Sequence, residues 1–214
     1  MNTRTVRLAA APLIAVLGAA ASPAAADVIF NTGNPGGFFG YIGYDVFESQ
    51  SVTVAFTPSA TYTLDDIGVW MMSNDFESPG RTYTLSLRPD AAGGATEPGN
   101  SIIESWNVST TAVGWNPVLE TVTSSLHPVL SAGTTYWIVA ESSEPGGYDP
   151  VWVWGDNADP VLSGNIDFFS SPNWQIGTVY GSAPGTIVNA TLVPAPGAIM
   201  LLGLGGTLAA RRRR

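Results

Sequence analysis

The sequence predicts an all-β protein: a single antiparallel β-sandwich, jelly-roll-like or immunoglobulin-like, with a targeting segment on each side. Several short stretches alternate polar and apolar residues at the period of two that suits a half-buried strand. No stretch carries apolar residues at helical spacing over three turns. Turn-rich stretches such as 31–40 and 89–100, which hold seven of the 24 glycines and three of the 16 prolines, separate the strands. These observations favour many short strands packed as two sheets.

Residues 1–26 are expected to form a signal peptide. Arg4 and Arg7 give its beginning a positive charge, and an apolar stretch follows. Ala24 and Ala26 then occupy the −3 and −1 positions before Asp27, the small-residue pattern that signal peptidase requires. An uncleaved N-terminal membrane anchor is the alternative, and these small residues disfavour it. We therefore expect export and cleavage between Ala26 and Asp27.

Residues 27–192 are expected to form the β-sandwich body as one domain. All seven tryptophans, seven tyrosines and eight phenylalanines of the chain fall in it, which indicates a real core. In 82–88, Tyr83, Leu85 and Leu87 share one face of the predicted strand, and polar residues share the other. Further strands are predicted at 51–56, 134–141, 151–155 and 186–192.

The charge of the body limits what it can bind. The formal net charge of the chain is −9, and all seventeen Asp and Glu residues lie between Asp27 and Asp167. Only Arg81 and Arg88 oppose them there. Nucleic acids and anionic lipid surfaces are bound through Lys and Arg, so this composition excludes nucleic-acid binding. The chain has no cysteine, so no disulfide can brace an exported domain.

Residues 193–214 combine two prolines, a short apolar segment and a cluster of arginines. A helix over 198–210 would measure about 20 Å, less than the roughly 30 Å hydrocarbon core of a bilayer. Pro194 and Pro196 prevent a regular helix from starting earlier. The positive cluster that follows consists of Arg211, Arg212, Arg213 and Arg214. After export of the body such a cluster stays on the cytoplasmic side and stops transfer, so the tail predicts a transient association with the membrane.

Val193, Pro194 and Pro196, followed by the apolar segment and the arginine cluster, resemble the PEP-CTERM sorting signal of exported bacterial proteins. Ala195 stands where that signal most often has glutamate, and Gly197 where it often has serine. The resemblance implies recognition by an exosortase-type membrane peptidase, removal of the tail, and release or attachment at the cell surface.

The stretches 57–69, 98–106 and 130–140, followed by a tryptophan-containing strand, resemble the bacterial choice-of-anchor domains, in particular the R type. This resemblance implies no catalytic activity. It implies structural roles instead: Leu64, Ile67 and Val69 in the core, Gly133 in a turn, and Tyr136 and Trp137 on opposite faces of a strand.

Candidate catalytic residues are few. His127 is the only histidine, and it lacks both the further ligands of a His-based metal site and the nucleophile motif of a triad. A loop or a strand end is therefore expected for it. Glu104, Glu120 and Glu141 lie on predicted strands, and two of them could hydrolyse a glycoside only if the fold brought them together.

Two more stretches offer candidate binding residues. Asp156, Asn157 and Asp159 carry oxygen ligands that suit Ca²⁺, but they lack the spacing and the bidentate glutamate of an EF-hand. The same residues are good turn formers, and we favour the turn. Trp152 and Trp154 share one face of 151–155, where an exposed pair would suit the face of a sugar ring. Burial in the core is favoured here too.

Taken together, these features predict a non-catalytic exported protein of the bacterial cell surface or extracellular matrix, with no cofactor and no metal site. Signal peptidase and an exosortase-type peptidase are the expected processing partners, and exopolysaccharide is a candidate ligand. A membrane-held precursor is expected first, and then a protein at the cell surface or outside the cell. Two alternatives stay open: a carbohydrate-binding module for exopolysaccharide, which needs an exposed aromatic surface, and a secreted glycoside hydrolase, which needs two carboxylates in a cleft.

Overall fold

The computed structural model describes residues 25–36, 42–92, 96–157, 159–180 and 183–194. Every regular element in this part of the chain is a β-strand, and no helix in it is long and apolar enough to cross a membrane. The predicted helix over 198–210 and residues 1–24 of the predicted signal peptide lie outside it. In chain order the strands are β1 (Asp27–Asn31), β2 (Gly43–Asp45), β3 (Gln50–Phe56), β4 (Tyr62–Ser73), β5 (Thr82–Pro89), β6 (Glu104–Ser109), β7 (Val118–Thr123), β8 (Val129–Leu130), β9 (Tyr136–Glu141), β10 (Pro150–Val153), β11 (Pro160–Asp167), β12 (Ser171–Tyr180) and β13 (Thr186–Leu192).

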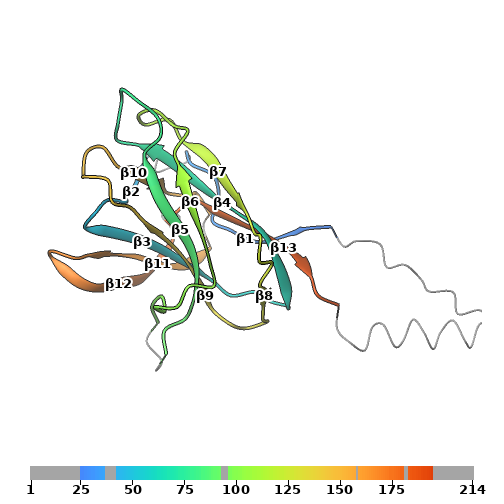
Figure 1. Ribbon diagram of the computed structural model, residues 1–214. Coiled ribbons are helices and arrows are strands. Elements are labelled where there is room, and N and C mark those ends of the chain that lie inside the picture. The colour runs from blue at the N-terminus through green and yellow to red at the C-terminus, as the bar shows by residue number, and fades with distance from the viewer. Residues whose placement is uncertain (1–24, 37–41, 93–95, 158, 181–182, 195–214) are drawn as a thin grey trace, which may run out of the picture.

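The strands form two sheets that pack against each other (Figure 1). One sheet has the order β1-β13-β4-β10-β2, with β7 and β8 also paired to β4, and the other has the order β12-β11-β3-β9-β5-β6. Both are antiparallel at every pairing of these strands. The prediction of an all-β chain with two packed antiparallel sheets, as in a β-sandwich, is therefore confirmed.

The long strand β4 organises the first sheet. One of its edges pairs with β13 and then with β10, and the opposite edge pairs with β8 and then with β7. A register shift leaves Asp65 without a partner on β13, which is the pattern of a β-bulge. Because the bulge adds one residue, Leu64 and Ile67 both face the core although they are three residues apart.

The core lies between the two sheets and is built from alternate residues of their strands. Full burial of one such aliphatic side chain contributes about 1.5–3 kcal/mol to stability. The members that are completely buried include Val52, Val54, Leu64, Ile67, Val69, Met71, Leu85, Leu87, Ile138 and Trp152.

A second apolar cluster lies on the other face of the six-stranded sheet. Trp137 and Val139 of β9 are fully buried there and pack with Trp174 and Ile176 of β12. The indole N–H of Trp137 donates to Asp90 Oδ1 at 2.8 Å. Both faces of β9 are thus covered, which explains why the strand is an uninterrupted apolar run.

Several sequence-based expectations are confirmed at residue level. Leu64, Ile67 and Val69 are 0% exposed and belong to the main core. Tyr136 contributes to the main core and Trp137 to the second cluster, so the two residues do lie on opposite faces of β9. Gly133 has a φ of 71°, a left-handed turn conformation that glycine adopts without steric cost. The predicted strand at 186–192 coincides with β13, and that at 82–88 lies within β5.

Candidate functional site

The residues that processing peptidases are expected to recognise lie at the limits of the described chain or beyond them. Ala26 and Asp27 are exposed, and Asp27 is the first residue of β1. Val193 and Pro194 are exposed directly after β13. The other predicted processing residues, Ala24, Pro196, Arg211, Arg212, Arg213 and Arg214, lie outside the described residues.

His127 lies in the loop between β7 and β8, as the sequence indicated. Its φ is 45°, an uncommon left-handed conformation for a residue other than glycine. Its Nδ1 is 3.0 Å from the carbonyl oxygen of Leu64, at the start of β4. The imidazole therefore fastens this loop to the sheet.

The three candidate glutamates lie on strands, as predicted, and each binds its own neighbours. Glu120 on β7 accepts the Thr111 N–H at 2.7 Å and the Thr111 hydroxyl at 2.6 Å. Glu141 on β9 forms an ion pair with Arg88 of β5. These contacts hold loops and strands together rather than joining two carboxylates across a cleft.

Glu104 on β6 is only 5% exposed and anchors the loop after β7. It accepts the Ser124 hydroxyl at 2.6 Å, the Ser125 N–H at 2.7 Å and the Leu126 N–H at 3.2 Å. Burial raises the pKa of this carboxyl group, but the hydrogen bonds outweigh that effect and lower the pKa overall. Glu104 is therefore an ionised structural residue.

Asp156 and Asn157 join the loop after β10 to the segment after β1. Asp156 Oδ1 accepts the Asn34 N–H at 3.2 Å, and the Asn157 amide donates to the Asn31 carbonyl oxygen at 2.7 Å. Asn157 Oδ1 in turn accepts the Asp159 N–H at 3.0 Å. These are the turn contacts that the sequence favoured. The described residues include no group of three or more His, Cys, Asp or Glu side chains that could hold a metal ion.

Both faces of β10 are buried, so Trp152 is not an exposed sugar-binding residue. Trp152 is 0% exposed in the main core, and its indole N–H donates to the Gly185 carbonyl oxygen at 3.1 Å. Val151 and Val153 are equally buried on the opposite face. Trp154 is half-buried, with its ring centroid 5.6 Å from that of Tyr44. This pair therefore does not form an exposed surface for sugars.

Three loops that each carry an exposed aromatic residue meet at one end of the sandwich. These loops lie at the upper left of Figure 1. These loops are 74–81 between β4 and β5, 110–117 between β6 and β7, and 142–149 between β9 and β10. Each contributes one exposed ring: Phe76 is 65% exposed, Trp115 59% and Tyr148 55%. We call these three residues, together with Asn74 and Arg81, the loop-end cluster.

Backbone hydrogen bonds join the three loops. The Gly114 N–H donates to the Asp75 carbonyl oxygen at 2.6 Å, and the Ser73 N–H donates to the Gly114 carbonyl oxygen at 3.1 Å. The Asn74 N–H donates to the Asp149 carbonyl oxygen at 3.0 Å. Gly114 has a φ of 60°, and a Cβ there would lie 2.7 Å from the Phe76 ring. Only glycine fits this approach, which places the Phe76 and Trp115 ring centroids 5.9 Å apart.

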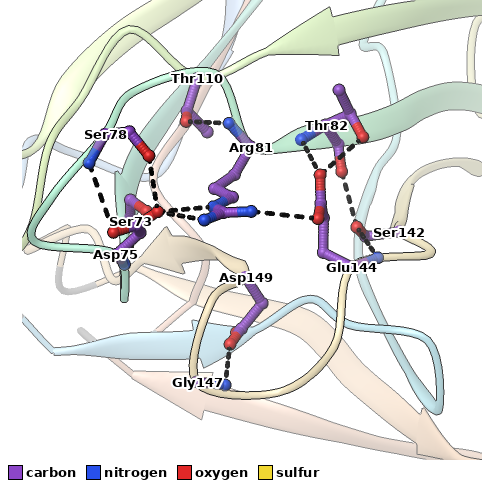
Figure 2. A network of polar contacts seen from close by, with 10 residues as sticks. All are labelled: Ser73, Asp75, Ser78, Arg81, Thr82, Thr110, Ser142, Glu144, Gly147 and Asp149. Carbon is purple, nitrogen blue, oxygen red and sulfur yellow. Dashed lines mark hydrogen bonds and ion pairs between the residues drawn. The ribbon is translucent and has the colours of Figure 1, made fainter.

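Asp75 holds the first loop in shape, as Figure 2 shows. It is 3% exposed and accepts the Glu77 N–H at 2.8 Å and the Ser78 hydroxyl at 3.0 Å. It also forms an ion pair with Arg81. The Glu77 N–H and the Arg81 guanidinium together hold the pKa of Asp75 well below its usual value.

Arg81 lies between two carboxylates and an aromatic ring. Its Nη1 is 3.5 Å from Glu144 Oε2, and its Cζ lies 5.4 Å from the centroid of the Tyr148 ring, within range of a cation–π contact. Glu144 also accepts the Thr82 N–H at 3.0 Å and the Thr82 hydroxyl at 2.9 Å, and the backbone bond is the main reason that its pKa is lowered. Asp75 and Glu144, which lie beside the cluster, thus balance the charge of Arg81 (Figure 2).

Asn74 fixes the orientation of Trp115. The Trp115 indole N–H donates to Asn74 Oδ1 at 3.0 Å. Asn74 Nδ2 donates to Asp45 Oδ1 at 3.1 Å and to Asp149 Oδ2 at 3.3 Å. Asp149 is 0% exposed, and burial, followed by the nearby charge of Asp45, raises its pKa.

An open groove adjoins the cluster on the six-stranded sheet. Its volume is about 460 Å³, and its lining is rich in hydroxyl and amide groups. The polar lining residues include Thr82, Thr84, Asn107, Ser109, Glu141 and Ser142. Thr82 connects the groove to the cluster because it follows Arg81 in the chain and binds Glu144, which pairs with Arg81.

Comparison with other proteins adds no assignment: no family model matches the chain, and no curated protein is similar to it.

The loop-end cluster was not predicted from the sequence, because the aromatic pair considered for sugar binding, Trp152 and Trp154, lies in a predicted strand. Phe76, Trp115 and Tyr148 stand alone within the turn-rich stretches DFESPG, GWNP and GGYDP. A single large aromatic residue surrounded by Gly, Pro and Asx residues is the signal that could have found them, because such loops lie at the surface.

Proposed function

We propose that this chain is a non-catalytic exported protein of the bacterial cell surface or extracellular matrix, processed at both ends. The observation that carries the proposal is the position of the folded body. The first strand begins at Asp27, the residue after the expected signal-peptide cleavage, and the last ends at Leu192, just before Val193. The strands of the described residues therefore lie between the two expected targeting segments.

The register of the sheet supports this proposal. Asp27 of β1 pairs with Ala190 of β13, and Leu192 pairs with Tyr62 of β4. Both ends of the folded body thus leave the sandwich at one end, on the right of Figure 1. Membrane peptidases at one bilayer surface would reach both cleavage regions without unfolding the body.

The burial and the hydrogen-bond partners of the carboxylates favour a non-catalytic role over glycoside hydrolysis. Asp45 and Asp149 are both bound to Asn74, beside the exposed rings, and are the strongest candidates for a catalytic pair. Asp149 is 0% exposed, however, so its carboxyl group cannot reach a glycosidic bond. Glu104, Glu120 and Glu141 are held by separate neighbours. The arrangement suits binding or scaffolding.

The proposal is tested by variants that separate two expected functions of the tail: retention of the precursor at the membrane and recognition by the exosortase-type peptidase. Each arginine costs roughly 2.5–3.5 kcal/mol at a bilayer centre, so the cluster is expected to retain the precursor. Replacing Arg211–Arg214 by Ser should release unprocessed protein into the periplasm or the medium. The matched variant, Pro194→Ala with Pro196→Ala, should keep its topology but resist removal of the tail.

Fractionation and mass measurement in a host that carries the matching exosortase separate these outcomes. The proposal fails if the Arg-to-Ser protein stays at the membrane and is processed normally. It also fails if the Pro-to-Ala protein matures to the mass of the parent protein.

A further inference from the structure

The loop-end cluster concentrates exposed aromatic surface. Five aromatic side chains of the described residues are at least half exposed, and three of them belong to this cluster. The other two, Phe168 and Phe169, lie at the turn between β11 and β12. A patch of exposed rings bordered by polar groups is typical of a ligand-binding surface.

The rings of the cluster are held in place before any ligand arrives. Trp115 is fixed through its indole N–H by Asn74, which is itself bound to Asp45 and Asp149. Phe76 packs against Trp115 and beside Gly114. Because these side chains are already ordered, binding would cost little conformational entropy.

Exposed and fixed aromatic rings suit sugars. One face of a pyranose ring presents C–H groups, which pack against the electron-rich face of an aromatic ring. The hydroxyl groups at the edge of the sugar need polar partners, and the adjoining groove offers Thr82, Thr84, Asn107 and Ser142. The cluster and the groove together thus provide stacking and hydrogen-bonding groups for several sugar units.

The charge of the cluster restricts which sugars fit. Asp45, Asp75, Glu144 and Asp149 surround it, and Arg81, the one cationic side chain of the cluster, is already paired with two of them. Uronate, sulfate or phosphate groups would meet uncompensated negative charge here, so anionic polysaccharides are disfavoured.

We propose that the loop-end cluster binds a neutral polysaccharide, with sugar rings stacked on Trp115 and Phe76 and the chain continuing into the adjoining groove. This inference names a ligand for the proposed surface protein. It rests on the proposed function only for the location of the protein outside the cell. Binding and tail processing are measured separately, so one can fail without the other.

The test is affinity electrophoresis of the full chain, purified in a detergent without a sugar headgroup. Native gels contain a soluble neutral β-glucan, a soluble neutral α-glucan, or alginate as the anionic probe. We expect at least one neutral glucan, and not alginate, to retard the protein. Trp115→Ala should raise the dissociation constant for that glucan by about tenfold or more. Trp115→Tyr, which keeps a ring, should retain part of the binding.

Phe169→Ala is the matched control, because Phe169 is 85% exposed but lies at the β11–β12 turn. It should bind as the parent protein does, and all variants should melt at similar temperatures. Four results would overturn the proposal: no retardation by either neutral glucan, equal loss in Trp115→Ala and Phe169→Ala, alginate binding as tight as glucan binding, or a Trp115-dependent dimer that accounts for the exposed rings.

Discussion

Asp149 is a fully buried carboxylate beside a second one, Asp45, and this makes the stability of the loop end depend on pH. Burial and the Asp45 charge raise the pKa of Asp149 in the folded protein. Its protonated form therefore stabilises the fold at acidic pH, and this contribution is lost as the pH rises through the folded-state pKa. Asp75 and Glu144, whose pKa values are lowered, behave in the opposite sense and lose their contribution as the pH falls.

We therefore expect Asp149→Asn to gain stability relative to the parent as the pH rises from 4 to 7. Asn lacks the titrating charge but keeps an oxygen that can accept the Gly147 N–H, which lies 2.6 Å from Asp149 Oδ1. The difference in melting temperature, variant minus parent, should increase by at least about 2 °C over this range. A difference that stays constant or falls would show that Asp149 is not strained by its charge.

A second residue-scale prediction concerns Glu104. Glu104→Ala leaves the Ser125 and Leu126 N–H groups without their acceptor and should lower the free energy of unfolding by about 3 kcal/mol. Glu104→Gln keeps one side-chain oxygen and should cost about 1 kcal/mol. Denaturant unfolding of the two variants measures both values, and equal costs would contradict the anchoring role.

At the scale of elements, the β11–β12 hairpin contains two glycines in contrasting positions. A Cβ on Gly164 would lie 2.0 Å from the Gln175 carbonyl oxygen of the partner strand, whereas a Cβ on Gly177 would meet nothing within 4 Å. Gly164→Ala should therefore destabilise the protein by at least about 2 kcal/mol. Gly177→Ala should be neutral or stabilise by up to about 1 kcal/mol, since it restricts the unfolded chain. Similar denaturation midpoints for the two variants would refute this packing.

Strands with a regular apolar pattern could be predicted from the sequence, and others could not. β3, β5, β9 and β13 were predicted because their β-branched and aromatic residues alternate or form apolar runs. The β11–β12 hairpin was missed because Gly164, Asn165, Pro172 and Gly177 interrupt its pattern. The bulge at Asp65 also disturbs the alternation in β4, and a bulge is defined by the partner strand, which local sequence does not specify.

The candidate site was even less predictable. Its rings come from three loops far apart in the sequence, and only the strand order brings them together. Conversely, the exposure of Trp152 depended on whether the outer face of β10 was covered. Met72 and Trp70 of β4 pack with Val151 and Val153 on that face, a contact that the periodicity of β10 alone cannot reveal.

On the scale of the whole molecule, β4 has a different region at each of its two ends. Tyr62, at its start, pairs with Leu192 beside the tail, and Ser73, at its end, leads into Asn74 of the loop-end cluster. The twelve residues of β4 separate these ends by about 36 Å at roughly 3.3 Å per residue. A chain held at the membrane by its tail would therefore direct the aromatic rings away from the bilayer.

The folded body should not depend on divalent cations. Asp156 Oδ1 accepts the Asn34 N–H and Asn157 Oδ1 accepts the Asp159 N–H, so two of the oxygens considered for Ca²⁺ already have hydrogen-bond donors. We expect millimolar Ca²⁺ or a chelator to change the melting temperature by less than about 2 °C. A rise of many degrees with Ca²⁺ that the chelator reverses would reveal a site that stabilises the fold.

The central claim, an exported protein processed on both sides of its sandwich, is tested most directly by the intact mass of the mature protein from a host that carries the matching exosortase. The account predicts a chain that begins at Asp27 and has lost Arg211–Arg214 together with the apolar segment before them. A mature protein that begins at Met1, or that keeps its arginine cluster, would contradict it.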